Sequence, residues 1–266
     1  MTLKSEWTGF MFNTPFKTVT FINTIVTDPP PGGFGIMKYA AVIFDLYGTL
    51  VDIFSYSEYR KTLGEMEKVL KVPPTEFVDM WFNTVHERAL GLFPTIEAHI
   101  TDICRRLGVT AESVDIERAV QLKLRYTIDS LHPRVDTLET LALLKSMGLK
   151  LGLLSDCSVE IPRLWPDTPF AQYIEEAVFS CDVLMKKPDP RMYHLVCHRL
   201  QVDPESCLYV GDGGSYELRG AQAMGMDAVC IRVPYEDRAD AHRIEAEEWE
   251  GPVISTLKDV VPLVCP

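Results

Sequence analysis

The feature that most constrains the fold is an alternation between short apolar runs and longer amphipathic segments in the second half of the chain. From Pro133 onward, strand-like runs at residues 149–154, 177–179, 208–210 and 228–233 are separated by segments with helical spacing. Such alternation predicts right-handed βαβ units and a parallel sheet. The apolar run at residues 39–44 has the same buried-strand character and is predicted to join this sheet.

A segment of different character, residues 53–130, lies between the first run and the others. It combines charged and apolar residues at helical spacing without a β-rich run, and glycine and proline breaks divide it. Four helices are expected, at residues 56–71, 74–91, 94–108 and 112–129. The sequence therefore predicts an α/β core domain formed by residues 37–52 and 131–266, with an all-helical cap inserted after the first strand.

Residues 1–36 differ from both parts. They show no sustained helical periodicity and end in the sequence PPPGG at residues 29–33, which is typical of a linker. A second methionine, Met37, directly precedes the first apolar run. We interpret the segment as a flexible extension or as a misassigned translation start.

The composition is that of a globular protein and limits its partners. A net charge of -12 would repel nucleic acids and anionic membranes, so neither is expected to bind. A small anionic substrate remains compatible, because a lysine, a bound cation or a helix N-terminus reverses the field locally. Seven cysteines without a C-x-x-C pair, and no secretory signal pattern, favour a reduced protein in the cytoplasm.

Polar residues follow the predicted strands at the positions where parallel sheets bind ligands. They are Asp45, Ser155 with Asp156, Lys187 and Asp212. Taken singly, each is equally well explained as a helix cap or a turn residue. Taken together, they predict one crevice that contains carboxylates, a hydroxyl and a lysine.

Four segments that carry these residues resemble the ordered motifs of the haloacid dehalogenase superfamily. They are VIFDLYGTL at residues 42–50, LLSD at 153–156, KKPDP at 186–190 and YVGDGGSYE at 209–217. The resemblance implies a Rossmann-like core with a helical cap, and a hydrolase that acts through a covalent intermediate on Asp45. A carboxylate nucleophile divides a difficult hydrolysis into two easier steps.

The resemblance also assigns roles to the neighbouring residues. Ser155 would hydrogen-bond a substrate oxygen, and Lys187 would neutralise charge on Asp45 and on the substrate. Thr49 and Asp156 complete the predicted substrate-binding set.

A divalent metal site is implied by the same motifs. Asp212 and Glu217, in a glycine-rich loop, would join Asp45 as oxygen ligands of Mg²⁺, together with the backbone carbonyl of Tyr47. A first-turn residue favoured by the helix dipole is the alternative explanation for Glu217.

Residues at two positions of these motifs favour different reactions. Phosphatases of the superfamily generally have a second Asp where this chain has Tyr47, whereas 2-haloacid dehalogenases generally have Tyr. Asp212, however, stands where metal-independent dehalogenases carry a neutral segment. Dehalogenases also place an Arg after the cap Trp to hold halide. Here Trp81 is followed by Phe82, and Arg88 comes one or two turns later.

We therefore expect a Mg²⁺-dependent phosphatase that acts on a small phosphorylated metabolite. A 2-haloacid dehalogenase is one alternative, and a non-catalytic protein that binds a metabolite or a protein partner is another.

The cap is expected to select the substrate. Of six apolar residues in this segment, most are predicted to form its core and some to face the active site or a second copy of the chain in a homodimer. They are Phe77, Trp81, Phe82, Leu90, Leu92 and Phe93.

Overall fold

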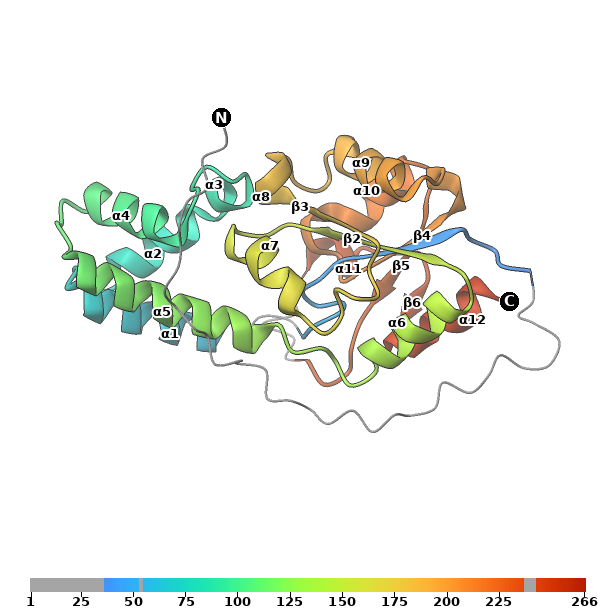
Figure 1. Ribbon diagram of the computed structural model, residues 1–266, viewed down its shortest axis with the longest axis horizontal. Helices are drawn as coiled ribbons and strands as arrows, with labels where there is room; N and C mark the ends of the chain where they lie inside the picture. The colour runs from blue at the N-terminus through green and yellow to red at the C-terminus, as the bar shows by residue number, and fades with distance from the viewer. Residues whose placement is uncertain (1–35, 53–54, 237–242) are drawn as a thin grey trace, which may run out of the picture.

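A computed structural model describes residues 36–52, 55–236 and 243–266 of the chain. Its centre is a parallel sheet of six strands in the order β3-β2-β1-β4-β5-β6 (Figure 1). The strands are β1 (Ala41–Phe44), β2 (Lys150–Ser155), β3 (Glu176–Phe179), β4 (Cys207–Gly211), β5 (Asp227–Ile231) and β6 (Val253–Ile254). The predicted α/β class is confirmed, and the first apolar run forms a central strand of the sheet.

Helices cover both faces of the sheet. The longer ones are α6 (Thr137–Ser146), α9 (Pro190–Leu200) and α10 (Glu217–Ala223), and α12 (Val261–Val264) ends the chain. Val42 and Phe44 of β1 pack in one buried cluster with α6 and α12. Ala41 and Ile43 pack in a second cluster with α9 and α10. Both faces of β1 are therefore buried, which explains why its sequence is continuously apolar.

Short elements complete the core. They are the helices α7 (Glu160–Leu164), α8 (Ser180–Val183) and α11 (Ile244–Glu247), and the 3₁₀ turns η1 (Trp165–Asp167), η2 (Pro204–Ser206), η3 (Gly214–Tyr216) and η4 (Leu257–Val260). The edge strand β6 was not predicted, because two residues carry no recognisable pattern.

Between residues 55 and 130, the described part of the segment after β1, there are five helices rather than the four expected. They are α1 (Tyr56–Leu70), α2 (Glu76–Asn83), α3 (Val85–Ala89), α4 (Ile96–Arg106) and α5 (Ser113–Ser130). The second predicted helix is interrupted at Thr84, whose hydroxyl donates to the carbonyl of Met80 at 2.9 Å. Side chains that hydrogen-bond to nearby backbone in this way compete with regular helix geometry.

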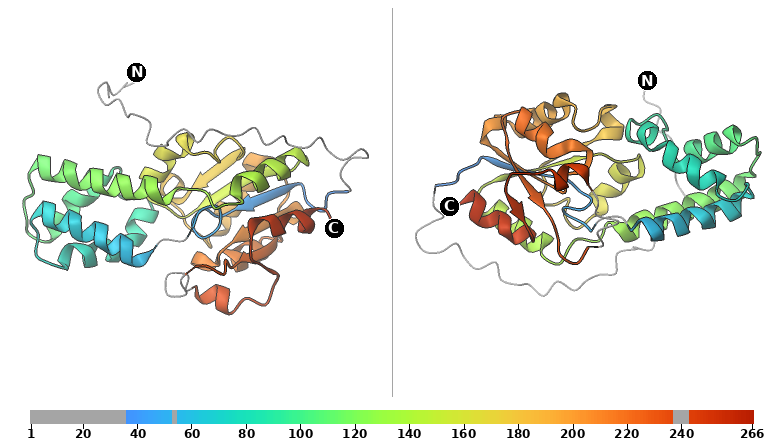
Figure 2. Two further views of the ribbon diagram at one scale, coloured as in Figure 1. Left: turned by 90° about the horizontal axis from the view of Figure 1, so that it is seen from below. Right: turned by 180° about the vertical axis from the view of Figure 1, so that it is seen from behind.

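These helices form a bundle beside one end of the sheet (Figure 1, Figure 2). They enclose a separate hydrophobic cluster that includes Leu63, Phe77, Trp81 and Ile100. The cluster supports the proposed division into a core and a cap, whose exact limits stay a prediction.

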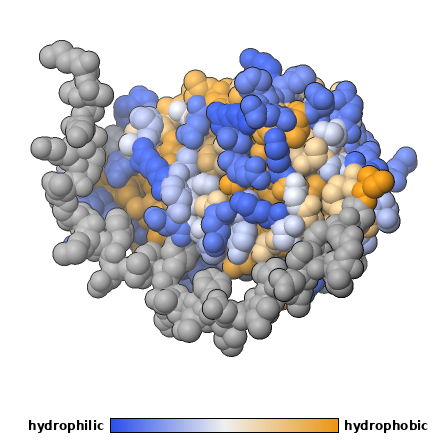
Figure 3. Space-filling view, turned by 45° about the vertical axis from the view of Figure 1, so that its right-hand side comes forward, coloured by the Kyte–Doolittle hydropathy of each residue, from blue (hydrophilic) through white to orange (hydrophobic). Residues whose placement is uncertain are grey.

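The surface in Figure 3 is mostly hydrophilic, with small apolar patches between the polar residues. None of the helices in the described ranges combines the length and the apolar character that crossing a bilayer requires. The interpretation of residues 1–36 concerns a segment that, except for Ile36, lies outside the described residues.

Candidate active site

Three polar side chains stand at the carboxyl ends of neighbouring strands in the middle of the sheet. Asp45 directly follows β1, Ser155 ends β2 and Asp212 directly follows β4. The pairings of β1 with β2 and β4 place these ends side by side. The amide of Asp45 donates to the carbonyl of Val210 at 2.9 Å. Residues of the first, second and fourth motifs therefore meet at one edge of the sheet, as expected for a parallel sheet.

Lys187 reaches this edge from the loop between α8 and α9. Its Nζ atom donates to Asp45 Oδ1 and to Glu217 Oε2, both at 2.5 Å. Its backbone N–H donates to Asp156 Oδ1 at 3.0 Å, so Asp156 holds the loop that carries the lysine. Burial alone would lower the pKa of Lys187, but the charges of Asp45 and Glu217 outweigh it and raise that pKa well above its ordinary value. Lys187 is therefore a permanent positive charge beside Asp45.

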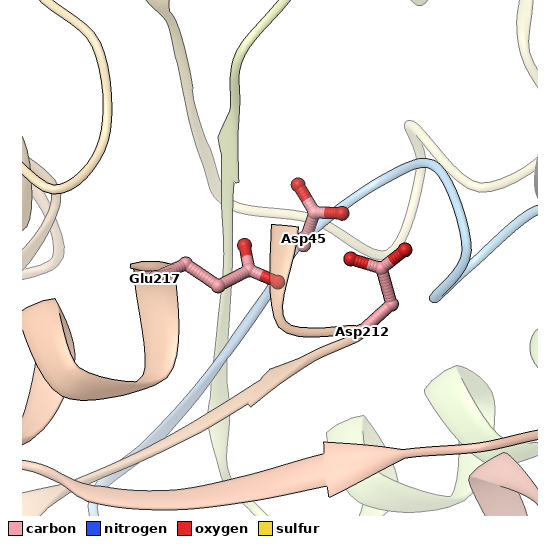
Figure 4. Close-up of side chains that lie close together, drawn as sticks. All are labelled: Asp45, Asp212 and Glu217. Atoms are coloured by element: carbon pink, nitrogen blue, oxygen red, sulfur yellow. The ribbon is translucent and has the colours of Figure 1, made fainter. Parts of the chain in front are cut away.

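The carboxylates of Asp45, Asp212 and Glu217 converge on the same buried space (Figure 4). One oxygen from each residue lies within 4.8 Å of the others. Burial, followed by the charge of Glu217, raises the pKa of Asp45 to about 7 against the opposing effect of Lys187. Burial also raises the pKa of Glu217 to about 7, and it raises the pKa of Asp212. Lys187 and Arg243, whose Nε lies 3.1 Å from Asp212 Oδ2, supply two positive charges against three carboxylates, so the cluster has the electrostatics of a cation site.

Glu217 is the most constrained member of the cluster. Its Oε1 atom accepts a hydrogen bond from the Gly213 N–H at 3.0 Å, and its Oε2 atom accepts from the Tyr209 hydroxyl at 2.8 Å as well as from Lys187. These three donors favour a role in positioning Lys187. Direct metal ligation by Glu217 stays a prediction.

The carboxylate oxygens of Asp212 accept fewer hydrogen bonds than those of Glu217. Its Oδ1 atom accepts a hydrogen bond from the Gly214 N–H at 2.8 Å. Its Oδ2 atom is buried and accepts no hydrogen bond within the described part of the chain. Arg243 Nε lies 3.1 Å from Oδ2, as a contact of opposite charges without hydrogen-bond alignment. A metal ion would supply the partner that Oδ2 lacks.

Gly48 allows the two loops of the site to approach each other. Its φ of +78° belongs to the left-handed region, and a Cβ at this position would lie 2.3 Å from Asp212 Oδ2. Only glycine fits both the turn after β1 and the close approach of Asp212.

Tyr47 connects the loop after β1 to the cap. Its hydroxyl lies 3.1 Å from the Oγ of Ser130, the last residue of α5. Burial raises the pKa of Tyr47 well above its ordinary value, so the hydroxyl keeps its proton at neutral pH. The side chain can therefore donate a proton but is a poor base.

The hydroxyl of Thr49 forms no hydrogen bond with the other predicted residues of the site. Thr49 is fully buried, and its hydroxyl has no hydrogen-bond partner among the residues that the structure describes. The substrate contacts expected of Thr49 and Ser155 stay predictions.

A cleft of about 580 Å³ borders the site, within the size range of small-molecule pockets. The core contributes Tyr47, Asp156 and Ser215 to its lining, and the cap contributes aromatic residues that include Tyr56 and Phe82. The carboxylates of the cluster are not part of the lining. Tyr47 and Ser215, which line the cleft, are each two residues along the chain from a carboxylate of the cluster, Asp45 and Glu217. The cleft therefore extends from the cap to the vicinity of the cluster.

Two residues at the site had no role assigned from the sequence. Tyr209 lies inside the fourth motif, and its position in a buried strand was the available sign that its hydroxyl needs a partner. Arg243 had no local signal, because it lies in a polar segment far from Asp212 along the chain.

Comparison with known proteins identifies the family. Residues 39–225 match the family model of haloacid dehalogenase-like hydrolases. The chain is 30% identical over 165 residues to glyceraldehyde 3-phosphate phosphatase of Methanopyrus kandleri, covering 61% of this chain and 71% of that protein. It is 25% identical over 198 residues to (S)-2-haloacid dehalogenase of Pseudomonas putida, covering 71% of this chain and 83% of that protein.

A solved structure shows the same fold. It is a haloacid dehalogenase family enzyme from Bacteroides thetaiotaomicron in complex with magnesium and inorganic phosphate, with a TM-score of 0.56 and 18% identity. The superposition covers 77% of this chain and 100% of that one. The family match spans all four motifs and more than half of the chain. The chain therefore belongs to the haloacid dehalogenase-like hydrolases.

Proposed function

We propose that this hydrolase is a Mg²⁺-dependent phosphatase that acts on a small phosphorylated metabolite through a covalent aspartyl phosphate. The observation that carries the proposal is the buried group formed by Asp45, Asp212 and Glu217. In a dehalogenase that works without a metal, buried carboxylates that repel one another beside the nucleophile would serve no function. The similarity to a glyceraldehyde 3-phosphate phosphatase supports the same reaction.

The residues present fit a magnesium ion. Mg²⁺ prefers oxygen ligands, takes one or two carboxylates from the protein and keeps several waters. Asp45 and the unsatisfied Oδ2 of Asp212 would hold it, with the Tyr47 carbonyl as a further ligand. When bound, Mg²⁺ withdraws negative charge from the phosphoryl oxygens and orients the phosphoryl group.

Asp45 acts as the nucleophile in the proposed reaction. One of its oxygens attacks phosphorus, the bond from phosphorus to the ester oxygen breaks, and the leaving oxygen takes a proton to form an alcohol. Water then attacks the aspartyl phosphate and releases inorganic phosphate, which restores the carboxylate. Lys187, 2.5 Å from Asp45, stabilises the charge that develops during both steps.

Tyr47 determines which proton transfers of the proposed reaction can be catalysed at its position. Because it holds its proton at neutral pH, it can assist departure of the alcohol but cannot activate the water. We therefore expect slower hydrolysis of the intermediate than in an enzyme with a carboxylate at this position. General acid-base catalysis typically contributes about 10²- to 10⁴-fold.

The second candidate is 2-haloacid dehalogenation. Tyr47 and the similarity to the Pseudomonas putida enzyme favour it. In that reaction Asp45 would attack the carbon that bears halogen, halide would leave, and water would hydrolyse the resulting ester.

Assays of p-nitrophenyl phosphate and L-2-chloropropionate, each with Mg²⁺ and with EDTA, separate the two reactions. We expect phosphate release that requires Mg²⁺ and no chloride release. Chloride release that persists in EDTA would overturn the proposal in favour of dehalogenation.

Substitution of the nucleophile tests the assignment to this site. Asp45→Asn should lower phosphate release by more than about 10³-fold without unfolding the protein, as measured by circular dichroism. Asp227→Asn is the matched control, since Asp227 pairs with Lys38 on the surface. Equal activity of Asp45→Asn and wild type would show that the reaction occurs elsewhere.

A further inference from the structure

The cleft is positively charged although the protein is strongly acidic. Four cationic side chains line it, Arg88, Lys123, Lys186 and Arg243, against two carboxylates, Asp156 and Glu160. The chain as a whole has a net charge of -12. Lys123 pairs with Glu160, and Arg243 pairs with Asp212 beside the cleft. Lys186 and Arg88 therefore carry the positive charge that favours an anion inside it.

Arg88 is the unusual member of this set. It belongs to α3 of the cap, and only 7% of its surface is exposed. One guanidinium nitrogen, Nη1, donates to the carbonyl of Trp81 and to Thr84 Oγ1, and the charge lies 4.8 Å from the centre of the Trp81 ring. Its Nε is buried without a hydrogen-bond partner among the described residues.

No carboxylate of the described chain pairs with Arg88. Glu160, which lines the same cleft, accepts a hydrogen bond from Lys123 Nζ at 2.6 Å. Glu87, the preceding residue in the chain, is bound by two nitrogens of Arg106, at 2.7 and 3.2 Å. Both nearby carboxylates are therefore hydrogen-bonded to other cationic side chains.

A buried guanidinium with neutral partners is energetically costly. Burial lowers the pKa of Arg88, and the charges of Glu160 and Glu87 offset this effect only in part. Helix capping and packing on Trp81 need donors and apolar surface, which a neutral side chain could also provide. An anion bound in the cleft would compensate the charge, and a carboxylate would match the planar guanidinium with two parallel hydrogen bonds.

We propose that Arg88 binds a carboxylate on the leaving group of the substrate, so that the preferred substrates are phosphate monoesters of hydroxy acids. This inference rests on the proposed phosphatase function. The cleft extends from Tyr47 and Asp156 near the nucleophile to Phe82 and Arg88 in the cap. A substrate whose phosphate lies at Asp45 would direct its leaving group along this path.

Matched pairs of esters test the proposal. 3-Phosphoglycerate and glycerol 1-phosphate differ by a carboxylate in place of a hydroxymethyl group, and 6-phosphogluconate and glucitol 6-phosphate differ in the same way over a longer chain. We expect wild type to have the higher kcat/KM for the acid of at least one pair. Arg88→Gln, which keeps a donor for the Trp81 carbonyl, should lower that value about 10- to 100-fold while the neutral ester changes less than about twofold.

Two further variants separate recognition from damage to the cap. Arg88→Lys keeps the charge but not the planar pair of donors, so it should retain part of the preference. Arg105→Gln removes an exposed arginine from α4 of the same cap and should leave all four substrates unaffected. Equal losses for acid and neutral esters in Arg88→Gln would overturn the proposal, as would a wild-type enzyme without preference for the acids.

Failure of the phosphatase function would be recognised separately. If wild type hydrolyses none of the esters in Mg²⁺, the same four ligands can be titrated calorimetrically into the unreacting protein. Tighter binding of an acid, lost in Arg88→Gln, would support the carboxylate site without phosphatase activity. Equal binding of acids and neutral esters, or no binding of either, would overturn it.

Discussion

At the scale of single residues, the site is defined by charges that are not balanced within the protein. Asp45 and Glu217 each accept a hydrogen bond from Lys187, whereas Asp212 Oδ2 accepts none. Like charges at this distance disfavour ionisation of one another, and burial strengthens the effect. The free protein therefore carries a local destabilisation that binding of a cation would remove.

Asp212→Asn should reveal this destabilisation. In EDTA, its thermal midpoint should equal or exceed that of wild type, because one buried charge has been removed from the cluster. Added Mg²⁺ should raise the midpoint of wild type and have little effect on the variant, since a ligand stabilises only the state that binds it. Differential scanning fluorimetry measures both effects. A Mg²⁺-induced rise of equal size in the variant would exclude Asp212 as a ligand.

At the scale of elements, a buried ion pair joins the cap to the core. Lys123 of α5 and Glu160 of α7 are both almost fully buried, and Lys123 Nζ lies 2.6 Å from Glu160 Oε1. Lys123 also donates to Thr127 in the next turn of α5, at 2.7 Å. Burial alone would raise the pKa of Glu160, but Lys123 outweighs it and lowers that pKa below its ordinary value. The pair therefore holds α5 against α7 as long as Glu160 is ionised.

Glu160→Gln should destabilise the protein by about 3–5 kcal/mol, because it leaves Lys123 buried without a counter-charge. Replacing both residues by methionine should cost much less than the sum of the single changes. Since the pKa of Glu160 is lowered by folding, its contribution exists above the ordinary carboxyl pKa and is lost as pH falls through the folded-state value. The stability difference between wild type and Glu160→Gln should therefore narrow below about pH 4. Urea titrations measure these differences, and additive effects of the single changes would contradict them.

At the scale of the whole molecule, the chain builds more than one hydrophobic core. Ile100 lies in the cluster enclosed by the cap helices, whereas Val196 packs with the sheet under α9. The two clusters share no residue. Separate cores permit one part of a protein to open while the other stays folded.

Ile100→Ala should lower the stability of the cap by about 2–5 kcal/mol through the cavity that it creates. Hydrogen exchange should accelerate in α1, α2, α4 and α5 and remain slow in β1, β2 and β4. Val196→Ala is the matched control and should accelerate exchange in the sheet and α9 instead. Uniform acceleration in both variants would mean that cap and core unfold as one unit.

Local patterns predicted much of this architecture. The buried strand before Asp45 and the sheet after residue 133 follow from short continuous apolar runs. The helical character of residues 53–130 follows from apolar residues at a period of 3.6. Both patterns are set by residues close together in the chain. The convergence of Asp45, Asp212 and Lys187 also followed, because parallel strands bring their carboxyl ends to one edge.

Only the tertiary structure decided which charges are paired. It showed that Glu217 holds Lys187 and that Arg243 approaches Asp212. It also showed that the buried Nε of Arg88 has no hydrogen-bond partner in the part of the chain that the structure describes. These facts depend on distances between residues far apart in the chain, or on whether a nearby acid is already bound by another cation. Periodicity and residue type carry no information about such distances. The sequence by itself therefore determined the family and predicted the residues of the site, whereas the buried arginine in the cleft became visible only in three dimensions.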